Sequence, residues 1–218
     1  MTRIDEIPKM QVNDYLFSDM KQSRQPTRIR QHQIVDVARK IAATRGIEDL
    51  TVREIARGVG ISEGDIYRHF KSKKEILLLL MDDIENTLLD TVEEAASRQT
   101  KALDKLREVL VAHLSYVEQR NGVSFIVIAE ALRLSDRDLR RKMLEVVERY
   151  LAHIKEILTQ AVEKEEIEAD IDIDTAATMF FAMVQTTVTL WSASEHAFSL
   201  TERYPLLWQS YMRNMAKR

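Results

Sequence analysis

The sequence predicts an all-α fold, with an N-terminal three-helix helix-turn-helix domain and a larger C-terminal helical domain. The chain of 218 residues has five glycines and three prolines, too few for the many turns of a β-sandwich or barrel. Four of the glycines fall within nineteen residues, at Gly46, Gly58, Gly60 and Gly64. Long uninterrupted helices are therefore expected outside that segment, and the length suffices for a sizeable buried core.

Composition narrows the class of protein. Apolar residues make up 45% of the chain and charged residues 31%, an ordinary balance for a globular protein. The absence of cysteine excludes disulfides, thiolate metal sites and cysteine nucleophiles. No apolar run approaches the roughly 18 residues of a membrane span, and residues 1–26 lack the apolar centre of a signal peptide. We expect a cytoplasmic protein with no membrane partner.

Charge is distributed unevenly along the chain. The net charge is −3, yet residues 27–80 carry eleven Lys and Arg against seven Asp and Glu, whereas residues 81–218 carry seventeen against twenty-four. A basic surplus in one small domain is the expected footprint of contact with DNA phosphates. A solvated charged face could produce the same surplus.

Residues 50–81 contain the signals around which the chain is organised. A hydroxyl residue is followed three positions later by an acid in three places: Thr51 with Glu54, Ser62 with Asp65, and Ser72 with Glu75. Each pair fits a capping box at the start of a helix. Gly60 follows the first short helix, where a left-handed turn suits glycine. Two short helices joined by a glycine turn predict a helix-turn-helix, whose second helix enters the major groove.

One helix precedes this segment. Residues 27–45 show Ile34, Ala38 and Ile41 on one stripe, with Gly46 as the stop signal. This helix should pack behind the helix-turn-helix and bury its apolar residues, Ile55, Ile66 and Phe70. Residues 1–26 form an extension, interpreted as a weakly held arm or, alternatively, as a helix that docks on a DNA-binding domain.

The remaining elements are also expected to be helices. A helix from Lys73 to about Ser97 is too long for the small domain alone and should link it mechanically to the rest. Helices follow at about 101–119 and 123–133. A capping box of Ser135 and Asp138 should open a long helix that ends near Lys164. An acidic surface loop then leads to a helix at about 174–194 and to a last helix capped by Ser199 with Glu202.

The helix at 174–194 is apolar nearly all round, which indicates burial on every side. In a domain of this size, one face should meet the core and the other a partner subunit. We therefore expect a homodimer held by this helix and the last one. The candidate interface residues are Phe181, Val184, Val188, Leu207 and Tyr211.

The helix-turn-helix segment resembles the tetracycline-repressor (TetR) family of bacterial transcription regulators. The family pattern is met without gaps by Thr51, Ile55, Ala56, Gly60, Ser62, Gly64, Tyr67, His69, Phe70 and Lys73. Asp65 departs from it, because a small or hydroxyl residue often stands there. An acid in a recognition helix repels phosphate, so we interpret Asp65 as the capping partner of Ser62.

The resemblance implies a dimer that binds double-stranded operator DNA through two recognition helices. By position in the pattern, Glu63, Gly64 and Tyr67 face the bases. Thr51, Ser62, His69 and Lys73 hold phosphates or position the helix. Glu63 could accept a hydrogen bond from a cytosine amino group, or be a solvated acid that favours the helix dipole. The domains are then an extension (1–26), a DNA-binding domain (27–80) and a ligand-binding and dimerisation domain (81–218).

The resemblance also implies a small-molecule effector that binds in the larger domain and releases the operator. Methionine adapts to varied apolar ligands. The candidate lining residues are His113, Phe125, Met143, Tyr150, Met179, Phe180 and Met183. Each could instead be plain core, and His113 a hydrogen-bonded core histidine.

Catalytic motifs are lacking, so we expect no enzyme, cofactor or metal site. The five histidines are scattered, and no nucleophile elbow, P-loop or dinucleotide fingerprint occurs. Two functions stay open: a repressor responsive to a small apolar ligand, and a ligand-independent DNA-binding adaptor or architectural protein. A cavity of roughly 300 Å³ or more in the larger domain would favour the first, and a filled core the second.

Overall fold

The computed structural model describes residues 27–47, 49–213 and 215. The expected interpretation of residues 1–26 lies outside this part. The described chain is all-α. Its helices are α1 (Thr27–Arg45), α2 (Val52–Val59), α3 (Glu63–His69), α4 (Lys73–Ser97), α5 (Ala102–Gln119), α6 (Val123–Arg133), α7 (Arg137–Glu163), α8 (Ile173–Ala193) and α9 (Leu200–Met212). This confirms the predicted fold class.

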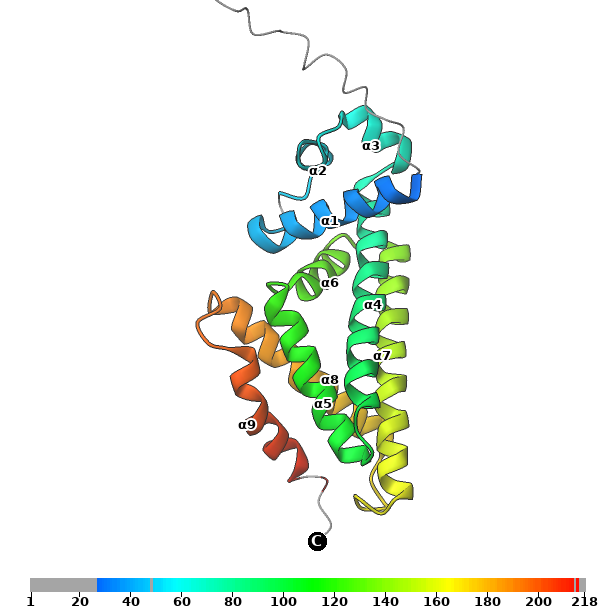
Figure 1. The fold of residues 1–218 in the computed structure, drawn as a ribbon, viewed down its shortest axis with the longest axis vertical. Helices are drawn as coiled ribbons and strands as arrows, with labels where there is room; N and C mark the ends of the chain where they lie inside the picture. The colour runs from blue at the N-terminus through cyan, green and yellow to red at the C-terminus, as the bar shows by residue number, and fades with distance from the viewer. Residues whose placement is uncertain (1–26, 48, 214, 216–218) are drawn as a thin grey trace, which may run out of the picture.

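Two long helices form the spine of the molecule. Figure 1 shows α4 and α7 side by side along the longest axis, with α1, α2 and α3 gathered at one end. Helices α5, α8 and α9 lie along the lower part, and α6 lies between α1 and the larger bundle. Helix α4 follows α3 after a short turn and continues into the bundle, so it links the helix-turn-helix to the larger domain.

The helix-turn-helix follows the capping pattern in two of three places. The Thr51 hydroxyl accepts a hydrogen bond from the Glu54 backbone N–H at 3.2 Å. Gly60 ends α2 with φ of +76°. Ser62 and Asp65 form a complete capping box at the start of α3. Beneath these caps, Ile55 and Ile66 are fully buried, as the sequence predicted.

Two predicted caps are wrong. At α4, the Ser72 side chain makes no capping bond; instead Glu75 accepts from the Lys71 backbone N–H at 2.8 Å. At α7, Asp136 is the N-cap and accepts from the backbone N–H groups of Asp138 and Leu139. Ser135 has a φ of +53° and belongs to the preceding turn. A carboxylate directly before the helix is a strong acceptor, so it displaces the serine one residue earlier.

Two other helix starts are capped by distant carboxylates. Glu166, in the loop after α7, accepts from the backbone N–H groups of Ala102 and Leu103 at 3.0 and 2.8 Å. Glu118 of α5 accepts from Leu200 N–H at 2.8 Å, at the start of α9. These contacts satisfy N–H groups that have no partner within their own helix, and they tie sequence-distant segments together.

The apolar core has two clusters, and the first crosses the predicted domain boundary. The DNA-binding helices share their core with the first half of α4, with one face of α6 and with the start of α7; the residues from outside the helix-turn-helix domain are Met81, Ile84, Val123, Val127, Ala131 and Leu139. The second cluster lies among α4, α5, α7, α8 and α9. Helices α4 and α6 therefore belong to both halves of the molecule.

Candidate DNA-binding surface and effector cavity

The predicted base-facing residues lie exposed on α3. Glu63, Gly64 and Tyr67 are all exposed, and the Tyr67 side chain reaches 53% exposure. Ile66 on the opposite side is fully buried and anchors the helix to the core. Tyr67 is therefore accessible on the side of α3 that points away from the core.

Asp65 is a capping residue, as interpreted from the sequence. Its carboxylate accepts from the Ser62 hydroxyl at 2.7 Å and forms an ion pair with Arg68 at 2.7 Å. The hydrogen bond from Ser62, together with Arg68, lowers the pKa of Asp65. Ser62 therefore positions the recognition helix, because its hydroxyl is already engaged in the cap.

The other predicted phosphate contacts differ in their surroundings. Thr51 is exposed at the start of α2. His69 is half-buried, and among the described residues its Nδ1 finds no hydrogen-bond partner. Lys73 lies elsewhere than expected: its ammonium is 3.3 Å from Glu130 Oε1 and 3.4 Å from the Ile47 carbonyl oxygen. Lys73 therefore has a partner inside the protein.

Glu130 is a buried carboxylate of α6 that holds cations from two helices. Arg133 contacts both of its oxygens at 2.6 and 2.9 Å, and Lys73 of α4 completes the set. The hydrogen bond from Arg133 lowers the pKa of Glu130, which burial alone would raise. The ionised pair of Lys73 and Glu130 thus joins the first turn of α4 to α6.

Two cations near the recognition helix were missed by sequence reasoning. Arg53 in the first turn of α2 and Lys71 in the turn after α3 are exposed, and neither forms an ion pair within the described part of the chain. By contrast, Arg57 and Arg68 are engaged with Glu54 and Asp65. Sequence alone does not separate paired cations from free ones, because the pairing depends on the tertiary neighbours.

The larger domain encloses a small cavity of about 30 Å³. Five helices contribute to it: α4, α5, α6, α7 and α8. The lining residues are Ile84, Leu88, His113, Ser124, Ile128, Val146, Val147, Tyr150, Phe181 and Gln185. The lining is mostly apolar with four polar side chains. Its volume is about that of one water molecule, well below the roughly 300 Å³ of ordinary ligand pockets.

The predicted pocket residues divide into two groups. His113 and Tyr150 line the cavity. The other five do not line this cavity: Met179 is 44% exposed, Phe180 is fully buried in the core, and Phe125, Met143 and Met183 are partly buried against the apolar clusters. Their chemistry suited a pocket, but the side of each helix that faces the cavity depends on tertiary packing.

His113 and Tyr150 form a buried polar pair in the cavity wall. His113 Nδ1 and the Tyr150 hydroxyl share a hydrogen bond of 2.8 Å, and the rings meet edge to face. Burial lowers the pKa of His113 to about 4 and raises that of Tyr150. His113 is therefore neutral near pH 7 and can accept or donate one hydrogen bond with its second nitrogen.

This pKa shift predicts a pH dependence of stability. The unfolded chain protonates His113 near pH 6.5 and the folded protein only near pH 4. The stabilisation is thus complete above pH 6.5 and is lost as the pH falls toward 4, by about 3 kcal/mol in all. Urea unfolding from pH 7 to 4 should show a smaller loss for His113→Gln than for wild type. An equal loss in both would contradict the shift.

The predicted dimer residues are mostly interior. Val184, Val188 and Tyr211 are buried in the subunit's own core, so the prediction that they meet a partner is wrong. Phe181 lines the cavity, and Leu207 is half-buried against the core. The outer face of α8 and α9 instead exposes Met179, Leu190 at 60% and Leu206 at 62%. Since α8 is apolar all round, the sequence left open which of its faces points outward.

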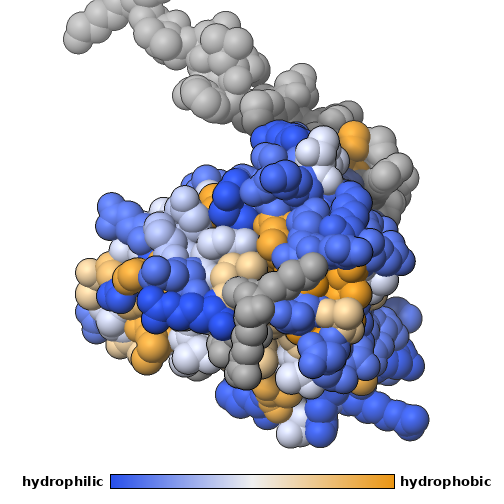
Figure 2. Space-filling model, turned by 90° about the horizontal axis from the view of Figure 1, so that it is seen from below, coloured by the Kyte–Doolittle hydropathy of each residue, from blue (hydrophilic) through white to orange (hydrophobic). Residues whose placement is uncertain are grey.

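Figure 2 looks onto the end of the molecule away from the DNA-binding helices. Hydrophilic side chains cover much of this view, and apolar ones gather in separate patches, one of them on the α8–α9 side at the left.

Within the described ranges, no three His, Cys, Asp or Glu side chains lie together as metal ligands would. No helix there has the length and apolar character needed to cross a bilayer.

An exposed recognition helix joined by α4 to a helical bundle with a cavity defines a helix-turn-helix transcription regulator. Comparison with known families agrees. Residues 34–80 match the family described as "Bacterial regulatory proteins, tetR family", and residues 82–210 match "YsiA-like protein, C-terminal region". The chain belongs to the TetR family, as the helix-turn-helix pattern indicated. Members are DNA-binding transcription regulators and not enzymes, and the chain is accordingly not an enzyme.

Individual relatives are similar over most of the chain. The "Fatty acid metabolism regulator protein" of Bacillus subtilis is 30% identical over 168 residues, which are 77% of this chain and 86% of that protein. The "Nucleoid occlusion factor SlmA" of Vibrio atlanticus is 25% identical over 172 residues, 79% of this chain and 88% of that protein. A crystal structure of the regulator FadR from Bacillus subtilis with stearoyl-CoA is 28% identical, covers 83% and 96% of the two chains and has a TM-score of 0.74.

Proposed function

We propose that this protein is a homodimeric, cytoplasmic repressor that a long-chain acyl-CoA releases from its operator. The ligand class is supported by the relatives, one described as a fatty acid metabolism regulator and one solved with stearoyl-CoA. The protein would bind DNA through its basic N-terminal helices, which comprise residues 27–80, and bind the acyl chain in the domain of residues 81–218.

One observation supports the mechanism: α4 and α6 line the cavity and also pack against the DNA-binding helices. Ile84 and Leu88 of α4 and Ser124 and Ile128 of α6 face the cavity. The same two helices pack under α1 and are joined by Lys73 and Glu130. A ligand that separates α4 from α6 must therefore also disturb the support of α3.

The cavity is small, so ligand binding would require the helices around it to move. A volume of about 30 Å³ cannot hold an acyl chain, so entry requires α4, α6, α7 and α8 to move apart. The compact state then favours operator binding, and the ligand selects an expanded state. His113, Tyr150, Ser124 and Gln185 offer hydrogen bonds to a carbonyl group of the ligand.

We propose that Arg53, Lys71, Thr51 and His69 contact phosphates while Glu63, Gly64 and Tyr67 face the bases. In a dimer, the two recognition helices would enter successive major grooves about 34–36 Å apart. The operator would then be a pseudo-palindrome. Lys73 would not contact DNA itself but would hold the start of α4 against α6 through its ion pair with Glu130.

The homodimer is proposed to form through the outer face of α8 and α9. Leu190→Glu and Leu206→Glu should each convert the dimer to a monomer, because an unpaired charge in an apolar contact costs several kcal/mol. Leu144→Glu is the control, since Leu144 on α7 is 53% exposed and lies on another helix. Sedimentation equilibrium would measure the mass. A stable dimer in both α8–α9 variants would contradict this interface.

A ligand-independent DNA-binding factor is the second candidate. The nearly filled core favours it by the criterion of cavity size, and SlmA, a nucleoid occlusion factor, is similar over most of the chain. The similarity to SlmA is lower in identity than the similarity to the fatty acid metabolism regulator. The repressor is therefore the better supported function.

Selection of binding sites from random DNA, followed by release, separates the two candidates. Full-length protein should enrich one pseudo-palindromic sequence. Stearoyl-CoA should then dissociate the selected duplex, while free coenzyme A at the same concentration should not. Enrichment of one sequence with no release by any acyl-CoA of 12 to 18 carbons would favour the ligand-independent factor.

A further inference from the structure

A second, larger recess lies outside the effector cavity, at the joint between the DNA-binding helices and the rest of the molecule. This cleft has a volume of about 380 Å³ and is lined by Gln31, His32 and Val35 of α1 and by Leu79, Asp82, Asp83 and Asn86 of α4. This volume is within the range of small-molecule sites, whereas the effector cavity of about 30 Å³ is below that range. None of these residues belongs to the DNA-binding surface or to the effector cavity described above.

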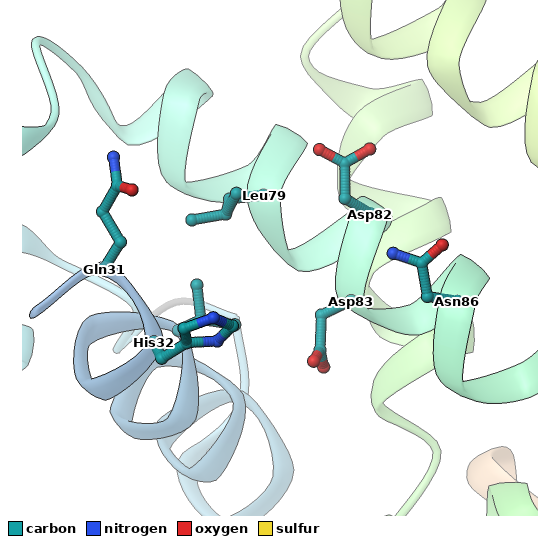
Figure 3. A pocket seen from close by; sticks show the side chains of 7 residues that line it. Gln31, His32, Leu79, Asp82, Asp83 and Asn86 are labelled. Carbon is teal, nitrogen blue, oxygen red and sulfur yellow. The ribbon is translucent and has the colours of Figure 1, made fainter. Parts of the chain in front are cut away.

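The cleft combines an apolar floor with polar side chains at its rim. Val35 is buried and Leu79 half-buried. In Figure 3, the His32 ring and the Leu79 side chain extend into the space between α1 and α4. Within the part of the chain that the structure describes, the side chains of Gln31, His32 and Asn86 make no hydrogen bond. A few convergent polar groups around an apolar floor are the usual composition of a ligand site.

The charges around the cleft favour a cation. Asp83 pairs with Arg39 at 3.1 Å, but Arg39 also pairs with Asp36. Asp82 pairs with Lys142 at 2.5 Å, but Lys142 also serves the buried Glu85 at 2.6 Å. Each cleft carboxylate thus shares its cation with another carboxylate.

The remaining carboxylate oxygens are available to a ligand. Within the described residues, Asp82 Oδ2 and Asp83 Oδ1 accept no hydrogen bond, since the ion pairs use Oδ1 of Asp82 and Oδ2 of Asp83. Arg149 of α7 is not available to these oxygens, because it forms an ion pair with Glu85 of α4. Four carboxylates, Asp36, Asp82, Asp83 and Glu85, therefore share three Lys and Arg cations here.

From these observations we propose that the α1–α4 cleft binds a small organic cation, an amine with an apolar body. The ammonium group would lie against the free Oδ1 of Asp83, with the apolar body on Val35 and Leu79. Gln31 and Asn86 would hydrogen-bond to polar substituents. The proposal is independent of the acyl-CoA effector, because the two sites share no residue. An occupant would bridge α1 and α4 and so hold the DNA-binding helices in one orientation.

Tryptamine is a suitable probe, with indole-3-propionate as a probe of similar shape and opposite charge. Calorimetric titration of the full-length protein should show binding of tryptamine and at least tenfold weaker binding of indole-3-propionate. Asp83→Asn, which keeps the side-chain shape, should weaken tryptamine at least tenfold. Gln31→Trp, which fills the rim, should abolish binding.

Asp90→Asn is the matched control, because Asp90 is an exposed acid on the same helix that does not line the cleft. It should leave the tryptamine affinity within twofold of wild type. Melting curves of all variants establish that they are folded. No binding of tryptamine to wild type, equal binding of both probes, or equal weakening by Asp83→Asn and Asp90→Asn would each overturn the proposal.

Discussion

Replacing Tyr67 by alanine is expected to weaken operator binding by on the order of 30-fold or more. Tyr67 is an exposed aromatic side chain on the recognition helix and lies one turn beyond its start. Loss of one base contact costs about 1–3 kcal/mol per half-site, and a dimer makes the contact twice. Fluorescence anisotropy on the selected duplex would measure the change.

A comparison of operator with random DNA shows whether Tyr67 contacts the bases. Binding to random DNA rests on phosphate contacts, so Tyr67→Ala should change it much less than binding to the operator. Tyr67→Phe is the control that keeps the ring and removes only the hydroxyl. Lys71→Ala should instead weaken both kinds of DNA and reduce the salt dependence. Equal losses on operator and random DNA for Tyr67→Ala would place Tyr67 outside base recognition.

Removing both cations from Glu85 is expected to cost about 3–5 kcal/mol of stability at neutral pH. Glu85 of α4 is buried, and its carboxylate contacts Lys142 and Arg149 of α7 at 2.6 Å each. Burial alone would raise the pKa of Glu85, but these two partners hold it below the ordinary value. The double variant Lys142→Ala with Arg149→Ala leaves a buried charge unpaired, the costly case for an ion pair.

The sign of the pH dependence distinguishes this mechanism from general damage. Without its cations, Glu85 should have a raised pKa, so the double variant should recover part of its lost stability as the pH falls from 7 to 5. Adding Glu85→Gln to the double variant should also restore stability at pH 7. Urea unfolding measures both effects. A loss of stability that is the same at pH 7 and 5, and that Glu85→Gln does not relieve, would refute this role of the ion pairs.

Local signals in the sequence predicted the helices well. The stripe of Ile34, Ala38 and Ile41 and the left-handed stop at Gly60 need few tertiary contacts, and the structure confirms both. The cap at Ser135 was wrong because two neighbouring residues, Ser135 and Asp136, could both start the helix. Caps supplied by Glu118 and Glu166 could not be predicted, since both carboxylates come from distant segments.

The candidate sites were harder to predict, because the rotation of each helix about its axis decides which of its residues face the core, the cavity or the solvent. A rotation of one residue, about 100° on a helix, separates the buried Phe180 from Met179 on the surface and Phe181 in the cavity wall. A helix apolar on all sides gives no internal evidence of that orientation. Lys73 shows the related limit for charges: its position in the family pattern suggested DNA, but its nearest anion is Glu130 of α6.

The central claim is that one ligand site and one DNA site are coupled through α4 and α6. A thermodynamic cycle tests it most directly: the affinity of the dimer for the selected operator is measured with and without saturating stearoyl-CoA, and the affinity for stearoyl-CoA with and without saturating operator. Coupling between two sites is reciprocal, so each ligand should weaken the other by the same factor, about 5-fold to 150-fold. Binding of both ligands with affinities unchanged by each other would contradict the account.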